Sequence, residues 1–167
     1  MHDNLPVTLL ARMALVALVI GTSVTVAATE RLTLSLVLSG SLGWVFVPLL
    51  QLLTGLLLVR GVPGGRSRQL ERYFATHWPW SIWILVFNAA VLLLPIRLSG
   101  LWLTATAVVP MLWTVWLLME FCRQDLALDS RMARRRVLLH QSVTYGLVVG
   151  YVSLAVALWP RLAGIIG

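Results

Sequence analysis

Residues 134–159 read RRRVLLHQSVTYGLVVGYVSLAVALW, which is three arginines followed by 23 residues without a formal charge. At about 1.5 Å per residue, a helix of that length covers the roughly 30 Å hydrocarbon core of a bilayer. Arginine and lysine are enriched on the cytoplasmic flanks of membrane spans, so Arg134, Arg135 and Arg136 orient the segment. Trp159 stands at the far end, where an interfacial aromatic residue is expected. The stretch predicts a transmembrane helix over 137–159 that enters the membrane from the cytoplasm.

The composition extends this interpretation to the whole chain. Of the 167 residues, 59% are hydrophobic and 11% are charged, whereas soluble domains carry about 25% charged residues. We therefore expect residues 1–167 to form a single membrane domain. The net charge of +7 comes from thirteen arginines in short loops, which favours contact with anionic lipid over binding to nucleic acid. The single cysteine, Cys122, excludes an intramolecular disulfide and a cysteine-based metal cluster.

Four further apolar segments precede the last one, so the predicted fold is an all-α integral membrane protein, a bundle of five transmembrane helices. Two prolines should bend their helices, Pro48 in the second span and Pro110 in the fourth. The five spans are expected at about 13–29, 32–59, 78–95, 101–120 and 137–159.

A cleaved signal peptide is the competing interpretation of residues 13–29. Arg12, the apolar run and Val26-Ala27-Ala28 loosely match that pattern. Counting Asp3, however, the segment before the run has no net positive charge. An uncleaved first span is therefore preferred.

Two arginine-rich loops, 60–77 and 121–136, are expected on the cytoplasmic side. An amino terminus in the cytoplasm places ten arginines on that side and leaves three outside. This predicts a cytoplasmic amino terminus and a carboxyl terminus outside. Within 60–77, Leu70, Tyr73 and Phe74 recur at helical spacing, which favours a short amphipathic helix on the membrane surface over an ordinary solvated loop. The three outside arginines are Arg31, Arg97 and Arg161.

Small residues recur every fourth position in the last span, at Ser142, Gly146 and Gly150. Such a stripe lets another helix approach closely. It predicts helix packing, either against another helix of the same chain or against a second protein. The arginines are expected to bind anionic headgroups or a cytoplasmic partner; the six we single out are Arg66, Arg68, Arg72, Arg134, Arg135 and Arg136.

Two histidines offer an alternative function. His77 and His140 belong to the inner ends of the third and fifth spans, and a haem is often held between two helices by one histidine from each. A haem- or quinone-binding redox subunit would use them, although His140 is expected one turn deeper than His77. The ordinary interpretation is a pair of interfacial polar residues, so no cofactor is expected in the preferred function.

A small transporter or channel is the second alternative. It would be built around Gln51, Asn88 and the two proline kinks, but no ionisable residue lies near a span centre. Glu120 falls at an inner end beside Arg123, where a local ion pair is expected.

Sites for chemistry are missing from the sequence. Asp125 and Asp129 lie among arginines that would repel a metal, so helix capping and pairing with arginine are expected of both. There is no nucleophile-elbow, zinc-protease or phosphate-loop motif, so neither a metal site nor an enzyme is predicted.

The layout resembles the five-span membrane family named for Ypt-interacting proteins, in its bacterial branch. The similarity covers roughly 32–159. It rests on the five-span plan, on Pro63-Gly64-Gly65 leading to Pro79, and on a short loop before the last span whose pattern residues are Leu126, Leu128, Ser130 and Ala133. The resemblance implies a non-enzymatic protein of the bacterial cytoplasmic (inner) membrane. The acidic amino-terminal region of eukaryotic members is missing, which argues against binding of Rab-type GTPases.

Together these observations predict a non-catalytic multi-pass protein that acts through helix association. It would serve as a scaffold or accessory subunit of a membrane complex, binding other subunits or itself, with an arginine-rich face toward lipid or a partner.

Overall fold

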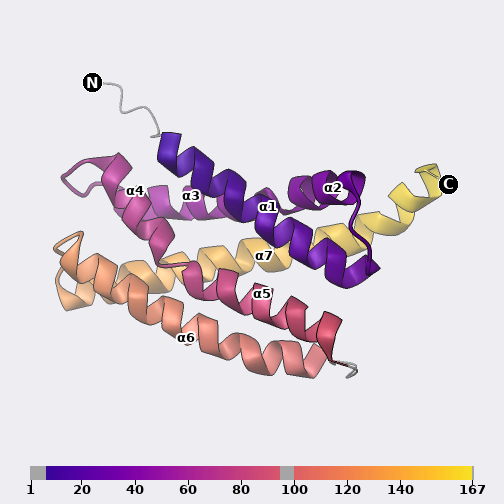
Figure 1. The fold of residues 1–167 in the computed structure, drawn as a ribbon. Helices are drawn as coiled ribbons and strands as arrows, with labels where there is room; N and C mark the ends of the chain where they lie inside the picture. Colours follow the sequence, from indigo (N-terminus) through magenta and orange to yellow (C-terminus); the bar gives the residue numbers. More distant parts are fainter. Residues whose placement is uncertain (1–6, 95–99, 167) are drawn as a thin grey trace.

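A computed structural model of the chain describes residues 7–94 and 100–166, and all of its regular structure in those ranges is helical. Figure 1 shows the helices lying side by side along the long direction of the molecule. Arg97 lies outside the described residues, as do the side chains of Trp159 and Arg161. The helices are α1 (Val7–Thr29), α2 (Leu34–Trp44), α3 (Phe46–Val59), α4 (Arg66–Ala75), α5 (Trp78–Leu93), α6 (Gly100–Gln124) and α7 (Ser130–Ile166).

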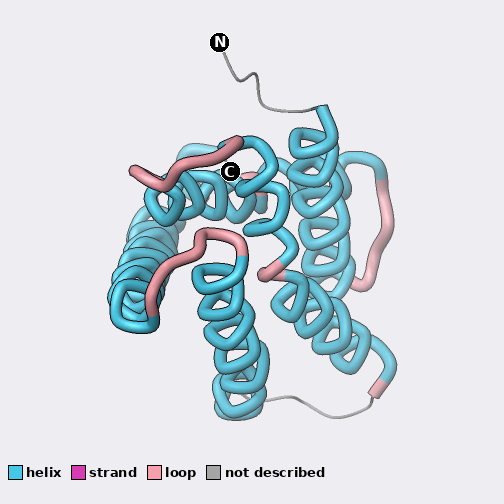
Figure 2. The backbone as a smooth tube through the Cα atoms, turned by 90° about the vertical axis from the view of Figure 1, so that its left-hand side faces the viewer, coloured by secondary structure: helices cyan, strands magenta, loops and turns pink. Residues whose placement is uncertain are grey.

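The helices pack both against neighbours in the chain and against helices distant in the sequence. Helix α1 packs against α2, α3 and α5, while α7 packs against α3 and α6. The short helix α4 lies against α3 and α6. The α3–α4 and α6–α7 connections meet at one end of the bundle, and the α1–α2 turn lies at the opposite end, as Figures 1 and 2 show.

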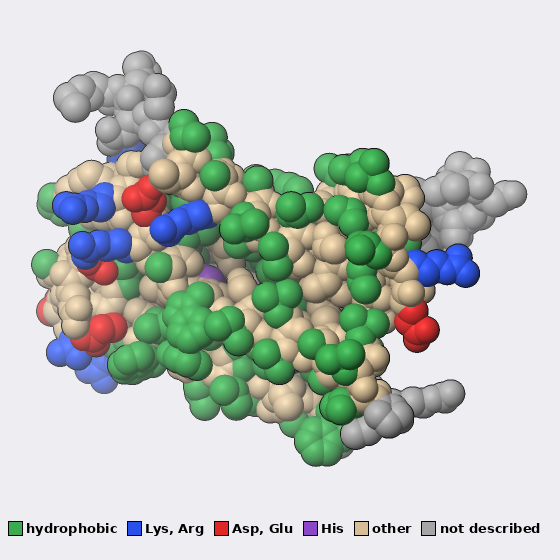
Figure 3. Space-filling model, viewed as in Figure 1, with side chains coloured by type: hydrophobic (Ala, Val, Ile, Leu, Met, Phe, Trp, Pro, Cys, Tyr) green, Lys and Arg blue, Asp and Glu red, His purple; other side chains and the backbone are tan. Residues whose placement is uncertain are grey.

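Four helical stretches of the described residues are long and apolar enough to cross a membrane. This is consistent with an integral membrane protein, and many large apolar side chains are exposed on the surface (Figure 3). The stretches are Val7–Thr29, Leu34–Val59, Arg66–Leu93 and Ala105–Gln124.

Charged side chains gather at one end of the surface, on the left of Figure 3. We call this the Arg-rich end; it comprises α4, the residues flanking it and the region from Arg123 to Arg136. The buried core lies beneath it, because Leu58, Leu70 and Leu118 are each at most 3% exposed.

The second apolar segment bends as expected, between Trp44 and Phe46. Pro48 has no N–H to bond to the carbonyl of Trp44, four residues before it, and its ring crowds that turn. Val45 instead donates to Leu42 O at 3.3 Å. The helix therefore restarts as α3, with Pro48 in its first turn.

The two predicted loops contain more helix than expected. Helix α6 continues to Gln124 and α7 already begins at Ser130, so Arg134, Arg135 and Arg136 lie on a helix and not in a loop. Residues 60–77 contain α4, which confirms the predicted short helix. Its apolar face, however, is buried against the bundle, because α3 and α6 leave a core at that end for it to cover.

The tightest helix contact is made by glycines of α1 and α2. A Cβ added to Gly21 would lie 2.5 Å from the carbonyl oxygen of Gly40. Only glycine permits two backbones to approach this closely. Gly21 and Gly40 thus serve helix packing within the chain.

Candidate functional site

The most enclosed polar group in the described residues lies at the Arg-rich end, between α3, α4 and α7. It consists of Thr54, Tyr73, His77 and His140, and we call it the Tyr73 cluster. Tyr73 is fully buried, Thr54 is 1% exposed, and the two histidines are 7% and 5% exposed. Buried polar atoms require partners, and the cluster supplies most of them internally.

The Tyr73 hydroxyl is the centre of this cluster. It lies 2.7 Å from Nε2 of His140, 2.8 Å from Oγ1 of Thr54 and 3.5 Å from Nε2 of His77. The imidazole rings of the two histidines are 5.8 Å apart, centre to centre. One phenol therefore links helices that are distant in the sequence.

Local sequence explains how the tyrosine reaches this position. Gly55 lies beneath its ring, and a Cβ at Gly55 would come within 2.7 Å of the ring carbons. His77 follows four residues after Tyr73, just beyond the end of α4, and its Nδ1 lies 3.1 Å from Oγ1 of Thr76. Both ring nitrogens of His77 thus lie near polar atoms of its own segment.

His140 differs from His77 in the hydrogen bonding of its Nδ1 atom. Its Nδ1 is buried and has no hydrogen-bond partner among the described residues. His140 is one of the residues lining a cavity of about 230 Å³ between α3 and α7, whose wall also includes Arg60 and Arg136. His77 lines a separate cavity of about 150 Å³ with Arg12 and Gln51.

The two predicted haem ligands, His77 and His140, lie close together, but the Tyr73 hydroxyl contacts both of them. The Tyr73 hydroxyl lies within hydrogen-bond distance of Nε2 of both histidines, where a shared iron would need to sit. Ligation by both nitrogens therefore requires Tyr73 to move out. Among the described residues, no three or more His, Cys, Asp or Glu side chains are grouped to hold a metal ion.

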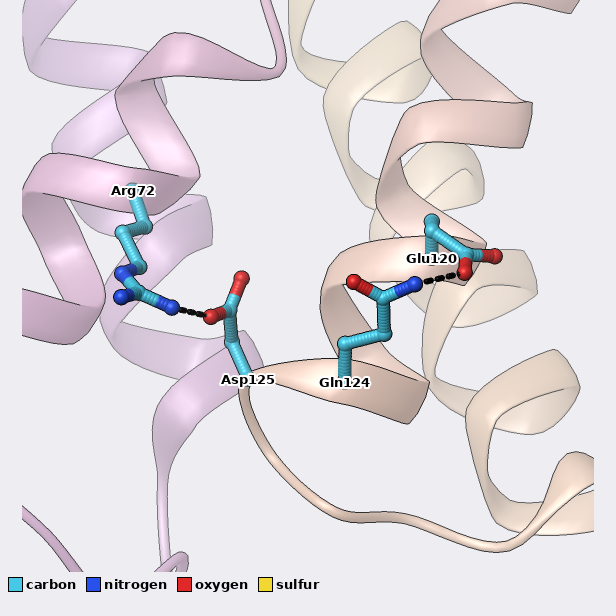
Figure 4. Close-up of polar contacts among 4 residues, drawn as sticks. All are labelled: Arg72, Glu120, Gln124 and Asp125. Atoms are coloured by element: carbon cyan, nitrogen blue, oxygen red, sulfur yellow. Dashed lines mark hydrogen bonds and ion pairs between the residues drawn. The ribbon is translucent and has the colours of Figure 1, made fainter.

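Asp125 and Asp129 each show one of the two roles expected of both, since Asp125 pairs with an arginine and Asp129 caps a helix. Arg72 on α4 forms an ion pair with Asp125 after α6, as Figure 4 shows. Asp129 caps α7, since its Oδ1 accepts from the backbone N–H of Arg131 at 2.8 Å and of Met132 at 2.9 Å. These backbone donors, Met132 first and then Arg131, lower the pKa of the Asp129 carboxyl.

Glu120 has a different partner from the one expected. It accepts a hydrogen bond from Gln124 one turn later on α6 (Figure 4), so the expected pair with Arg123 is not formed. The spacing of four residues on one helix brings these two side chains together.

The six predicted lipid-binding arginines lie in one region but differ in their contacts. Five are exposed, and Arg136 is half-buried, with its Nη1 donating to the carbonyl of Leu58 at 2.6 Å. Arg134 donates to Ser130 O on its own helix at 3.2 Å. Arg66, Arg68, Arg72, Arg134 and Arg135 are the exposed five.

The small-residue stripe of α7 points outward. Ser142, Gly146 and Gly150 are exposed, and a Cβ added to either glycine would meet nothing within 4 Å. Packing of this stripe against another helix of the same chain is therefore not formed in the described residues.

The polar residues singled out for transport do not converge. Asn88 donates to Oγ of Ser23 at 2.9 Å and lines an apolar cavity of about 530 Å³ between α1 and α5. Gln51 lines the separate cavity that contains Arg12 and His77. The two amides therefore do not form one pathway.

Sequence reasoning missed the central role of Tyr73 and the part of Thr54. Tyr73 was assigned only to the apolar face of a surface helix. The spacing of four residues between Tyr73 and His77 and the Thr54-Gly55 pair were the available signals.

No family model, curated protein or solved structure matches the chain. The resemblance to the Ypt-interacting protein family stays a hypothesis based on its sequence features. The buried positions of Leu126 and Ala133 give two of its pattern residues a packing role that any bundle of this shape would need.

Proposed function

We propose that the protein is a five-span membrane protein without catalytic activity that acts by associating with other membrane helices. Its amino terminus lies in the cytoplasm and its carboxyl terminus outside. The Arg-rich end then faces the anionic cytoplasmic leaflet, in keeping with the enrichment of arginine on that side. A bacterial cytoplasmic membrane is the proposed location.

The fifth span is supported by the length of α7. Its 37 residues measure about 55 Å as a helix, which exceeds the roughly 30 Å hydrocarbon core. Arg134, Arg135 and Arg136 lie in its first two turns and mark the level of the headgroups. The uncharged residues that follow cross the bilayer.

The proposed association rests on a difference between two groups of glycines, one packed against this chain and one facing open space. At Gly21, Gly40 and Gly55, atoms of this chain already fill the space a side chain would need. Gly146 and Gly150 face open space on one side of α7. Helices associate in lipid by close packing of small residues, so this open stripe is the surface for a second copy or another subunit.

The test enlarges the stripe and leaves the rest of the surface unchanged. Gly146→Leu with Gly150→Leu should reduce self-association, or the recovery of copurifying subunits, in protein extracted with native lipid. Leu147→Phe is the matched control, since Leu147 is 45% exposed on the same helix outside the stripe. Native mass spectrometry measures both. A wild-type protein that is strictly monomeric and carries no other subunit contradicts the proposal.

A further inference from the structure

The cavity between α3 and α7 combines cations, a buried histidine and an apolar wall. Its volume is about 230 Å³, room for a phosphate group and its attached atoms at roughly 30 Å³ per water-sized group. Arg60 follows the end of α3, and Arg136 lies near the start of α7. The cavity therefore lies at the Arg-rich end, where the headgroup level is proposed.

The charges of the cavity favour an anion. Arg60 and Arg136 line it, and none of its lining residues is a carboxylate. Arg136 is held in place by the Leu58 carbonyl, which takes only one of its five N–H donors. Arg60 is exposed and has no ion pair among the described residues. Both guanidinium groups can therefore bind phosphate oxygens.

His140 adds a polar atom that lacks a partner. The residue is 5% exposed and is one of those lining the cavity, and its Nδ1 has no hydrogen-bond partner among the described residues. The Tyr73 hydroxyl lies at the other ring nitrogen. When that hydroxyl donates to Nε2, the neutral imidazole carries its proton on Nδ1. The histidine then offers a donor one turn deeper than Arg136.

The remaining walls are apolar and open to the side. Leu57 is 48% exposed and Leu139 is 64% exposed, and both lie on the cavity with Val143. A ligand bound only through its negative charge would not need this apolar surface. A ligand with a phosphate and a hydrocarbon chain matches both parts of the surface.

We propose that this cavity binds the phosphate group of an anionic phospholipid from the cytoplasmic leaflet. Arg60 and Arg136 hold the phosphate oxygens, and His140 donates to an ester oxygen on the membrane side. One acyl chain runs along Leu57 and Leu139. This assignment rests on the proposed orientation of the Arg-rich end. It adds Arg60 and His140 to the lipid-binding residues expected from the sequence.

The other cavities lack this combination. The cavity beside His77 has one arginine, Arg12, and both ring nitrogens of His77 already lie near polar atoms. The cavity beside Asn88 is lined by no charged residue. The α3–α7 cavity is thus the best match for a phosphate with an attached chain.

The experiment titrates the purified full chain in detergent with phosphatidylglycerol or phosphatidylcholine of identical acyl chains, followed by native mass spectrometry. We expect phosphatidylglycerol to bind at least about tenfold tighter, and Arg60→Gln to weaken it by about tenfold, as for loss of a charge-assisted hydrogen bond. Val143→Phe fills the cavity without changing charge and should weaken binding similarly. Arg123→Gln is the control, since Arg123 is exposed at the same end but does not line the cavity, and it should change the affinity less than about threefold.

Three outcomes overturn the assignment in different ways. Equal weakening by Arg60→Gln and Arg123→Gln shows diffuse attraction to the whole face, which removes the site but leaves the proposed function. Displacement of the lipid by millimolar inorganic phosphate shows a site for free phosphate instead. Phosphatidylcholine carries the same phosphate diester but no net charge, so equal binding of both lipids overturns the assignment to an anionic lipid. Association through α7 is tested separately.

Discussion

The hydroxyl of Tyr73 lies 2.7 Å from Nε2 of His140, although the two residues are 67 positions apart in the chain. This contact joins α4 to α7 beneath the charged surface. It positions one ring nitrogen of His140 and leaves the other without a partner. The packing of the Arg-rich end and the proposed lipid site therefore depend on the same phenol.

Tyr73→Phe should destabilise the protein because it removes this hydroxyl and leaves the buried Nε2 of His140 unpaired, while Thr54 Oγ1 keeps its hydrogen bond to the Leu50 carbonyl. We expect the free energy of unfolding to fall by about 1–3 kcal/mol, measured by thermal or denaturant unfolding in detergent. Tyr145→Phe is the control, since the Tyr145 hydroxyl is buried without a described partner and its loss should be nearly neutral. Equal effects of the two variants would refute the role of the Tyr73 cluster.

Gly55→Ala should be destabilising although alanine is the better helix former. The new Cβ would lie 2.7 Å from the Tyr73 ring, and overpacking of this kind costs about 1–3 kcal/mol. Gly43→Ala, in a helix where a Cβ meets nothing within 4 Å, should be neutral or stabilising by up to about 1 kcal/mol. Unfolding of both variants in the same detergent provides the comparison, and a neutral Gly55→Ala would contradict the close approach of Tyr73.

The orientation of the chain can be tested with single cysteines. Cys122 is fully buried, so Cys122→Ala provides a background without other thiols. In intact cells, a membrane-impermeant thiol reagent should label Leu32→Cys in the α1–α2 turn and should not label Gly65→Cys before α4. Permeabilised cells should show labelling at both positions. The reverse pattern in intact cells would place the Arg-rich end outside and contradict the proposed topology.

Asp129 should contribute stability at neutral pH and lose that contribution in acid. The backbone N–H groups of Met132 and Arg131 bind its ionised form and hold its pKa below the usual value. A carboxyl whose pKa is lowered by folding stabilises the folded state above its unfolded pKa, and this is lost as the pH falls through the folded pKa. Asp129→Ala should therefore lower the Tm at pH 7.

The difference in Tm between wild type and Asp129→Ala should narrow below about pH 4, the usual range for this carboxyl. Asp129→Asn is the control that keeps a capping oxygen, and it should lose less at pH 7. A difference that is independent of pH would show that the ionised carboxylate has no special role at the start of α7.

The sequence alone was sufficient for the helical, membrane-type character of the chain, for the bend before Pro48 and for the capping role of Asp129. These features depend on short-range properties, namely runs of uncharged residues, a missing N–H and a side chain beside the first turn of a helix. Their physical causes lie within a few residues, so a linear pattern contains them.

Only the tertiary structure decided how the helices are rotated against one another. That rotation turns Gly146 and Gly150 of α7 outward, while Gly21 of α1 and Gly40 of α2 approach each other closely. It also brings Thr54, Tyr73 and His140 together from three helices. Such contacts depend on which face of each helix is buried, and that is set by the packing of the whole bundle.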